Sequence, residues 1–297
     1  MPEISISEWD PSTMVPDATI LIIGKRHTGK SVLTRDIMYN IKDSLDLVVG
    51  MNPTEQANRT LSFFTPPAFI FHSFDDQKLH HILDWQRRCV ANNKGRRVGF
   101  IMDDCMSETI GSGSRKKKIM SSGDISKVFK LGRHYKLFFL NAMQYICDAP
   151  PEIRGNVDLL FAFNTTSQME REKLWKEYFG MFKSYRDFCK VFETCAQGYE
   201  CIVLDTRKAA QTPEKCIFYY KAKMHTEPFQ VGNPIYWKLS KHYFVDKADY
   251  SMDASKVLGI APTQLGDQGE QEIEFSTVGT DLRIVKRSPS RSPRSPR

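Results

Sequence analysis

A glycine-rich segment between an apolar run and a helical pattern constrains the fold of this chain more than any other feature. The apolar run Ile20–Ile23 leads directly into Gly24-Lys-Arg-His-Thr-Gly-Lys-Ser31. Two glycines permit a tight turn in which successive backbone N–H groups point at one anion. Apolar residues then recur at helical spacing at Val32, Leu33, Ile37, Met38 and Ile41. We predict a buried parallel strand, a phosphate-binding loop and a helix, in that order.

The chemistry of this loop predicts a nucleotide-binding site, and the alternative is a glycine-rich turn that happens to fit the pattern. Lys30 can reach the β- and γ-phosphates, and the Ser31 hydroxyl can ligate Mg²⁺. The candidate nucleotide-binding residues are Gly24, Lys25, Arg26, His27, Thr28, Gly29, Lys30 and Ser31.

A second apolar run ends in two carboxylates, Asp103 and Asp104. Downstream of a phosphate-binding loop, the first acid is expected to hold Mg²⁺ and the second to act as the base that polarises the attacking water. The alternative is a solvated strand end. We expect one strand between the loop strand and this acidic strand, the arrangement of motor-type ATPases.

Further polar residues flank later strands. Gln144 follows the apolar run Leu137–Leu140 and is predicted to sense the γ-phosphate or position water, or else to be a plain strand-end donor. Arg133 and Arg154 are expected beside the ligand edge of the sheet. Each is a candidate arginine finger for a neighbouring subunit, and the alternative is a salt bridge with a nearby acid.

The pattern predicts an α/β fold of the P-loop NTPase class, RecA/ASCE-like, with a mainly parallel central sheet between helices. Further strands are predicted near 47–50, 68–71 and 159–163, and helices near 75–90, 124–131, 167–179 and 185–193. An antiparallel pair, 200–205 and 216–221, is expected to extend the sheet as a C-terminal β extension. We divide the chain into an irregular arm (1–17), a P-loop ATPase domain (18–245) and a disordered Arg/Ser/Pro-rich basic tail (246–297).

Composition bears on the partners. The 297 residues carry a net charge of +7, which favours a polyanionic partner without identifying one. The run Arg115, Lys116, Lys117 and Lys118 is predicted either to contact nucleic-acid phosphates or to be a solvated loop. The Arg-Ser-Pro repeats of the tail suit phosphate contact or serine phosphorylation, although a solubilising tail is the plainer interpretation.

The compartment is predicted from three observations. The start of the chain has an acidic flank and no long apolar run, so it is not a secretory signal. No stretch reaches the length of a membrane span. The seven cysteines are scattered, without a C-x-x-C pair, which indicates reduced thiols in a cytosol-like compartment.

Together the ordered motifs resemble the poxvirus-type virion DNA-packaging ATPases of large nucleocytoplasmic DNA viruses, a branch of the FtsK–HerA superfamily. The resemblance covers about residues 18–245. The matching segments are Gly24–Ser31, Val48–Glu55, Phe100–Asp104, Gly132–Tyr135, Gln144, Ile153–Asn156, Phe192–Cys195 and Gly198–Asp205.

The resemblance implies a ring-forming homo-oligomer that hydrolyses ATP with Mg²⁺ and drives double-stranded DNA into a preformed capsid. It also implies sequence-independent DNA contact, capsid or inner-membrane partners, and action in the virion and at assembly sites in the host-cell cytoplasm. Two alternatives stay open. One is a P-loop kinase, which needs an acceptor pocket and an arginine-rich lid, and the other is a nucleotide-gated assembly scaffold with little hydrolysis.

Overall fold

The computed structural model describes residues 5–105, 109–110, 117–146, 151–208 and 212–243. The strands are β1 (Ser7–Glu8), β2 (Thr19–Ile23), β3 (Leu47–Met51), β4 (Ile70–Phe71), β5 (Val98–Asp103), β6 (Thr109–Ile110), β7 (Lys117–Lys118), β8 (Leu137–Met143), β9 (Leu159–Phe163), β10 (Glu200–Asp205) and β11 (Ile217–Lys221). The helices are α1 (Lys30–Ile41), α2 (Glu55–Asn58), α3 (Asp76–Ala91), α4 (Gly123–Leu131), α5 (Pro151–Arg154), α6 (Gln168–Tyr178), α7 (Tyr185–Cys195), α8 (Pro213–Cys216) and α9 (Pro234–Tyr243).

Most of these strands form one nine-stranded sheet in the order β1-β11-β10-β9-β2-β8-β5-β3-β4. The run from β9 to β4 is parallel throughout. Strands β2, β3, β5, β8 and β9 are buried along their whole length, which explains their continuous apolar runs. The single strand β8 separates β2 from β5, so the prediction of one strand between the loop strand and the acidic strand is confirmed.

The C-terminal strands extend the sheet, as predicted, by two antiparallel pairings. β10 runs antiparallel to β9, and β11 runs antiparallel to β10. The start of β10 and the end of β11 therefore lie at the same edge of the sheet as the carboxyl ends of the parallel strands. We call this edge the carboxyl edge, and the candidate site lies there.

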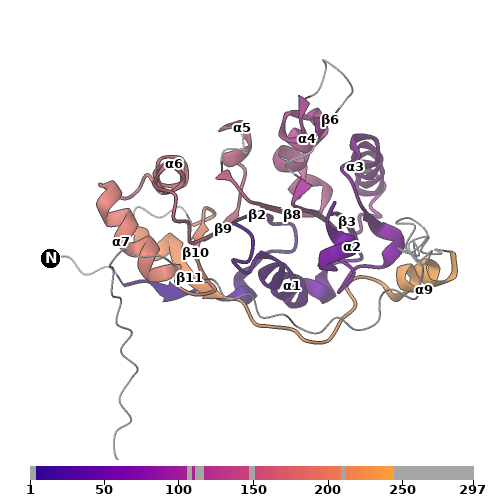
Figure 1. Cartoon of the computed structure of the whole chain (residues 1–297). Coiled ribbons are helices and arrows are strands. Elements are labelled where there is room, and N and C mark those ends of the chain that lie inside the picture. Colours follow the sequence, from indigo (N-terminus) through magenta and orange to yellow (C-terminus); the bar gives the residue numbers. More distant parts are fainter. Residues whose placement is uncertain (1–4, 106–108, 111–116, 147–150, 209–211, 244–297) are drawn as a thin grey trace, which may run out of the picture. The chain divides into compact units, whose positions relative to one another are not determined.

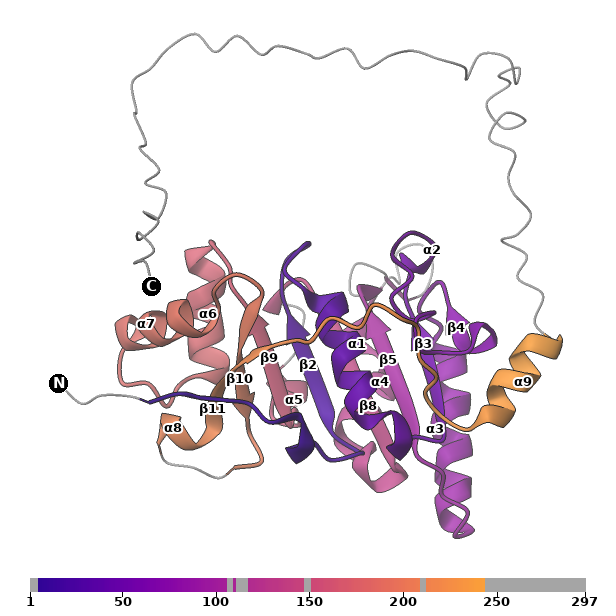
Figure 2. The same ribbon diagram turned by 90° about the horizontal axis from the view of Figure 1, so that it is seen from below.

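Helices cover both faces of the sheet (Figure 1). Helices α3, α4, α6 and α7 bury their apolar residues in one core with side chains such as Val49 and Phe139. Helix α1 packs on the opposite face through Leu33, Ile37 and Met38. On that face the chain after β11 crosses α1 towards α9 (Figure 2). Both faces of the central strands are thus removed from water, the condition under which a parallel sheet is stable.

The N-terminal segment differs from the irregular arm that we predicted. Ser7 and Glu8 pair in parallel with β11. The next residue, Trp9, is only 2% exposed, and its ring packs edge-on against Phe161 and Tyr220 at 5.0 and 5.1 Å. A strand of two residues has no readable periodicity, and the partners of Trp9 are distant in sequence, so local pattern could not reveal this strand.

Smaller differences concern the lengths of elements, and two of the predicted segments lie outside the described part of the chain. Strand β4 begins at Ile70 because Pro67–Phe69 forms a 3-10 turn, and β8 extends to Met143. Helix α9 was not predicted. Arg115, Lys116 and the tail at 246–297 lie outside the described residues. No helix within the described ranges combines the length and apolar character needed to cross a bilayer.

Candidate nucleotide-binding site

A cleft of about 1030 Å³ opens at the carboxyl edge of the sheet. This volume is large enough for a ligand of nucleotide size. The cleft is lined by Arg26, His27, Gly29, Lys30, Ser31, Val32, Thr54, Ala57, Asn58, Asp103, Asp104, Gln144, Tyr199, Lys221, Ala222 and Met224. The predicted loop, the predicted acid pair and Gln144 therefore meet in one cavity.

The glycine-rich loop connects β2 to α1, as predicted, and its two glycines have different structural reasons. Gly29 has a φ of 108°, a left-handed conformation that favours glycine. At Gly24 the reason is close packing, because a Cβ built there would lie 2.6 Å from Thr28 Oγ1 and 2.9 Å from Phe163 Cδ2. Within the described residues no side chain caps α1 at Gly29, so its first N–H groups are available to an anion.

Lys30 is held over this loop. Its ammonium donates to the carbonyl oxygens of Gly24 at 2.6 Å and Lys25 at 2.9 Å. Burial lowers the pKa of Lys30, and the carboxylates of Asp103 and Asp104 oppose that shift. The cation therefore lies between the loop and the acid pair, where phosphate oxygens would compete with the carbonyl groups for its hydrogen bonds.

The two acids sit in different environments. Asp103 is the last residue of β5 and is 5% exposed. Burial raises the pKa of its carboxyl group to about 6, against the attraction of Lys30. Asp104 is only partly buried and adopts a φ of 55°, and its backbone N–H donates to the carbonyl of Ala142. That turn directs the second carboxylate into the cleft instead of along the strand.

Gln144 joins the acid pair from the neighbouring strand. Its Nε2 donates to Asp104 Oδ1 at 2.6 Å. Because β8 lies between β2 and β5, residues that follow β8 lie between the loop and the acids. The amide therefore fixes the orientation of the Asp104 carboxylate beside the space that Lys30 faces.

Ser31 and Asp103 could hold a magnesium ion. Both line the cleft, and both offer the oxygen ligands that Mg²⁺ prefers. Among the described residues, no group of three or more His, Cys, Asp and Glu side chains forms an all-protein metal cage. A two-ligand site fits Mg²⁺, which commonly keeps several waters and binds through one or two protein groups together with substrate phosphates.

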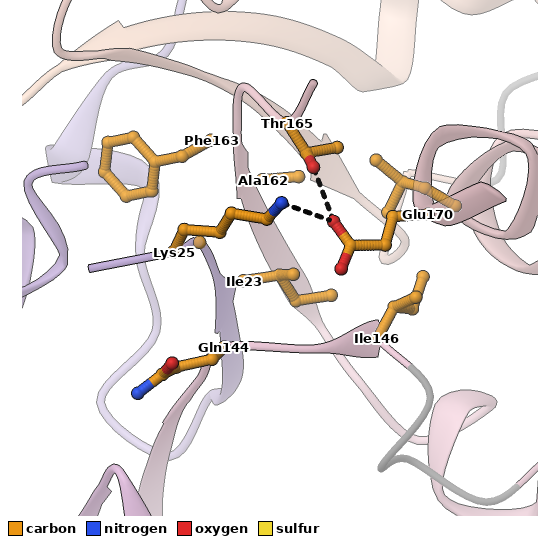
Figure 3. Close-up of a pocket in the computed structure, with 10 residues that line it drawn as sticks. Ile23, Lys25, Gln144, Ile146, Ala162, Phe163, Thr165 and Glu170 are labelled. Atoms are coloured by element: carbon orange, nitrogen blue, oxygen red, sulfur yellow. Dashed lines mark hydrogen bonds and ion pairs between the residues drawn. The ribbon is translucent and has the colours of Figure 1, made fainter. Parts of the chain in front are cut away.

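Behind the loop, an ion pair with Glu170 holds the Lys25 side chain. Its Nζ lies 3.6 Å from Glu170 Oε2, and the Thr165 hydroxyl donates to the same carboxylate at 2.5 Å. Figure 3 shows Lys25 reaching toward Glu170 and Thr165. These groups border a cavity of about 20 Å³, which is room for one water. Lys25 therefore braces the loop from outside the cleft, and Gly24 and Thr28 likewise form the turn and not the lining.

The two predicted arginines are not at this site, which corrects their expected place beside the ligand edge. Arg133 precedes β8 and so lies at the amino ends of the parallel strands, where it pairs with Asp158. Arg154 pairs with Glu177 at 2.5 Å, near the end of α6. Neither arginine is among the described residues that line the cleft. The salt-bridge alternative therefore describes both side chains within this chain.

The basic run is described only in part. Lys117 and Lys118 form β7, which pairs antiparallel with β6, and the Lys118 side chain is exposed. This small hairpin follows β5, the strand that carries the acid pair. Its contact with nucleic acid stays a prediction.

The sequence did not single out Glu55, although the resemblance included it. This carboxylate is 3% exposed and accepts hydrogen bonds from Asn52 Nδ2, Leu61 N–H and Ser62 N–H. It fixes the segment that supplies Thr54, Ala57 and Asn58 to the cleft. A buried acid with three donors is a structural brace, because hydrogen bonds from its own chain hold both of its carboxylate oxygens.

The cleft wall made by Tyr199, Lys221, Ala222 and Met224 was also missed. Tyr199 lies in the segment Gly198–Asp205 of the resemblance but was assigned no role there, and the other three residues belong to no motif. The two segments that carry them meet only through the pairing of β10 with β11.

Comparison with known proteins places the chain among viral proteins. No known family profile matches it. It is 30% identical over 265 residues to the "Uncharacterized protein L437" of Acanthamoeba polyphaga mimivirus, covering 86% of this chain and 89% of that protein. It is also 30% identical over 216 residues to "Uncharacterized protein 088R" of Invertebrate iridescent virus 3, covering 72% of this chain and 80% of that one.

A solved structure shares the fold. The genome packaging NTPase B204 from Sulfolobus turreted icosahedral virus 2 superposes with a TM-score of 0.51 at 16% identity. The match covers 71% of this chain and the whole of B204. The P-loop NTPase fold predicted from the sequence is thereby confirmed.

Proposed function

Because the chain belongs to the family of large-DNA-virus proteins that includes these mimivirus and iridescent virus relatives, we propose that it is an ATPase motor that packages double-stranded viral DNA. One observation carries the proposal: Lys30, the acid pair and Gln144 converge on one cleft, with Gln144 Nε2 2.6 Å from Asp104 Oδ1. The fold that the chain shares with the genome packaging NTPase B204 of Sulfolobus turreted icosahedral virus 2 supports it.

The residues divide the chemistry among them. The N–H groups at the start of α1 and the Lys30 ammonium bind the phosphates and neutralise their charge. Asp104, oriented by Gln144, holds the attacking water and accepts its proton. Ser31 and Asp103 would hold Mg²⁺, which when bound neutralises charge that develops on the β- and γ-phosphate oxygens.

DNA contact is assigned to the basic run Arg115–Lys118, which follows the acidic strand β5 in sequence. Four adjacent positive charges suit the phosphate backbone without reading bases. Loss of the γ-phosphate would change the contacts of Gln144. Because Gln144 bonds to Asp104, and Asp104 precedes the basic run in sequence, that change would move the basic run. We place the motor in a homo-oligomeric ring, with capsid or inner-membrane partners, at assembly sites in the host-cell cytoplasm and in the virion. Arg133 and Arg154 pair with Asp158 and Glu177 within their own chain, so a role for either as an arginine finger would require that ion pair to break in the ring.

The decisive experiment measures phosphate release from Mg-ATP with and without long duplex DNA. We expect DNA to stimulate the wild-type protein, and Lys30→Ala and Asp104→Asn each to abolish turnover. Matched controls are Lys190→Ala and Asp43→Asn, which change exposed residues outside the cleft. A wild-type protein that binds ATP but releases no phosphate would indicate a scaffold. Transfer to a small acceptor, without a response to DNA, would indicate a kinase.

A second experiment separates basal ATP hydrolysis from contact with DNA. Replacing all four residues of Arg115–Lys118 by alanine should preserve basal hydrolysis and remove the stimulation. Stimulation of the wild-type protein should also fall steeply as salt is raised, because phosphate contacts release counterions. Stimulation that persists in the quadruple variant would assign DNA contact to another segment.

A further inference from the structure

The cleft has a wall that the phosphate chemistry does not use. Tyr199, Lys221, Ala222 and Met224 line it, and we call this set the Tyr199 wall. Tyr199 is 64% exposed and Met224 is 75% exposed. Large apolar side chains left open to water inside a ligand-sized cleft are a common feature of binding surfaces.

Sheet order places this wall opposite the reacting end of the nucleotide. Along the carboxyl edge, the start of β10 is followed by the ends of β9, β2, β8 and β5 (Figure 2). Neighbouring strands are about 4.8 Å apart, so the acids that end β5 and Tyr199 directly before β10 stand about 10 Å on either side of the loop strand β2. A triphosphate bound on the loop with its γ-phosphate toward Asp104 must direct its nucleoside the other way. That direction leads to Tyr199.

The wall lies directly against the phosphate-binding loop. A Cβ built on Gly29 would lie 3.6 Å from Tyr199 Cδ1 and 3.4 Å from Phe163 Cε1. The Tyr199 ring is therefore in contact range of the turn that opens α1. The absence of a side chain at Gly29 leaves space between the loop and the ring.

The opposite part of the wall is anchored to α1 by a buried carboxylate. Asp36 is fully buried and accepts from the Tyr220 hydroxyl at 2.5 Å and from the Lys223 N–H at 2.9 Å. Its other oxygen lies 2.9 Å from His225 Nε2, and the His225 ring stacks on Tyr39 of the same helix. The segment that carries Ala222 and Met224 is thus fixed to the helix that follows the phosphate loop.

We propose that the Tyr199 wall binds the nucleobase, with the Tyr199 ring and the Met224 side chain contacting the face of a purine. This assignment rests on the proposed function, since it names the base subsite of that nucleotide site. Aromatic rings bind bases by stacking, and a methionine thioether packs well on an aromatic face. Such contacts recognise the π-face, so the wall contributes affinity for a nucleotide over a bare triphosphate.

The test compares two ligands. Calorimetric titration of the full chain with Mg-ATP and with inorganic tripolyphosphate separates base binding from phosphate binding. We expect Tyr199→Ala to weaken ATP binding about tenfold to a hundredfold and to leave tripolyphosphate binding unchanged. Tyr199→Phe should bind ATP like the wild type, and Met224→Ala should show a smaller loss than Tyr199→Ala.

Control variants distinguish failure of the base-subsite assignment from failure of the proposed nucleotide site. Met169→Ala removes a methionine that is 78% exposed and lies outside the cleft, and it should change nothing. Lys30→Ala should weaken both ligands. If Tyr199→Ala and Met224→Ala bind ATP like the wild type while Lys30→Ala does not, the base-subsite assignment is overturned and the nucleotide site stands. The same assignment falls if Tyr199→Ala changes only the oligomeric state. A wild-type chain that binds neither ligand would overturn the proposed function together with this subsite.

Discussion

The hydrogen bond between Gln144 and Asp104 provides the sharpest test of the catalytic arrangement. Gln144→Ala removes the amide that donates to Asp104 Oδ1 at 2.6 Å and leaves the Asp104 backbone in place through its own bond to Ala142. Gln144→Met removes the donor and keeps most of the side-chain length. Both variants therefore release the carboxylate without altering the sheet.

The expected size of the effect follows from the charge on the acceptor. A hydrogen bond to a charged group contributes about 1.5–3 kcal/mol, and each 1.36 kcal/mol corresponds to tenfold in rate. If Gln144 orients the base for attack, kcat falls about 10- to 160-fold in both variants. Because the interaction acts on the attacking water, kcat and kcat/KM should fall together while KM changes little.

The assay is steady-state phosphate release, with thermal unfolding as the check on folding. Gln77→Ala is the matched control, because Gln77 is an exposed glutamine on α3 away from the cleft. Wild-type kcat in Gln144→Ala would refute the view that Gln144 orients the base. A raised KM at unchanged kcat would assign Gln144 to nucleotide binding alone.

Three further variants test the structure around the site. Gly24→Ala should weaken ATP binding about fivefold to a hundredfold in calorimetric titration, because its Cβ would lie 2.6 Å from Thr28 Oγ1 and relief of that contact deforms the loop. Asp36→Ala should lower the free energy of unfolding in urea by about 3–5 kcal/mol, since buried donors lose their acceptor. Arg133→Ala should lower the free energy of unfolding by about 1 kcal/mol and leave ATP affinity unchanged, because the exposed guanidinium of Arg133 pairs with Asp158 outside the cleft.

Gly24→Ala and Asp36→Ala have matched controls, and each of the three variants has a result that would contradict its prediction. Gly180→Ala adds a Cβ with no atom within 4 Å, and Asp43→Ala removes an exposed acid that follows α1. Normal ATP binding in Gly24→Ala would show that the loop tolerates the added atom. An unfolding free energy in Asp36→Ala equal to that of Asp43→Ala would show that the buried network adds no stability. Loss of ATP binding in Arg133→Ala would show that Arg133 contributes to the nucleotide site.

Local sequence determined the central part of this protein. The strand, glycine loop and helix around Gly24–Ser31 could be predicted because turn geometry and anion binding depend on adjacent residues. Fully apolar runs identified the buried parallel strands, and the acids that end β5 identified the second half of the site. The resemblance to proteins of large DNA viruses also rested on such local motifs, and the mimivirus and iridescent virus relatives confirm it.

Tertiary structure alone decided which distant residues share a neighbourhood. Asp36 meets Tyr220 across 184 positions, and Arg133 lies at the amino ends of the strands because its chain enters β8 there. Tyr199 reaches the phosphate loop only because β10 turns back along β9. Periodicity and motif spacing describe neighbours along the chain, whereas these contacts depend on strand order and direction. The sequence therefore predicted the phosphate half of the site, and only the assembled sheet brought the Tyr199 wall to the cleft.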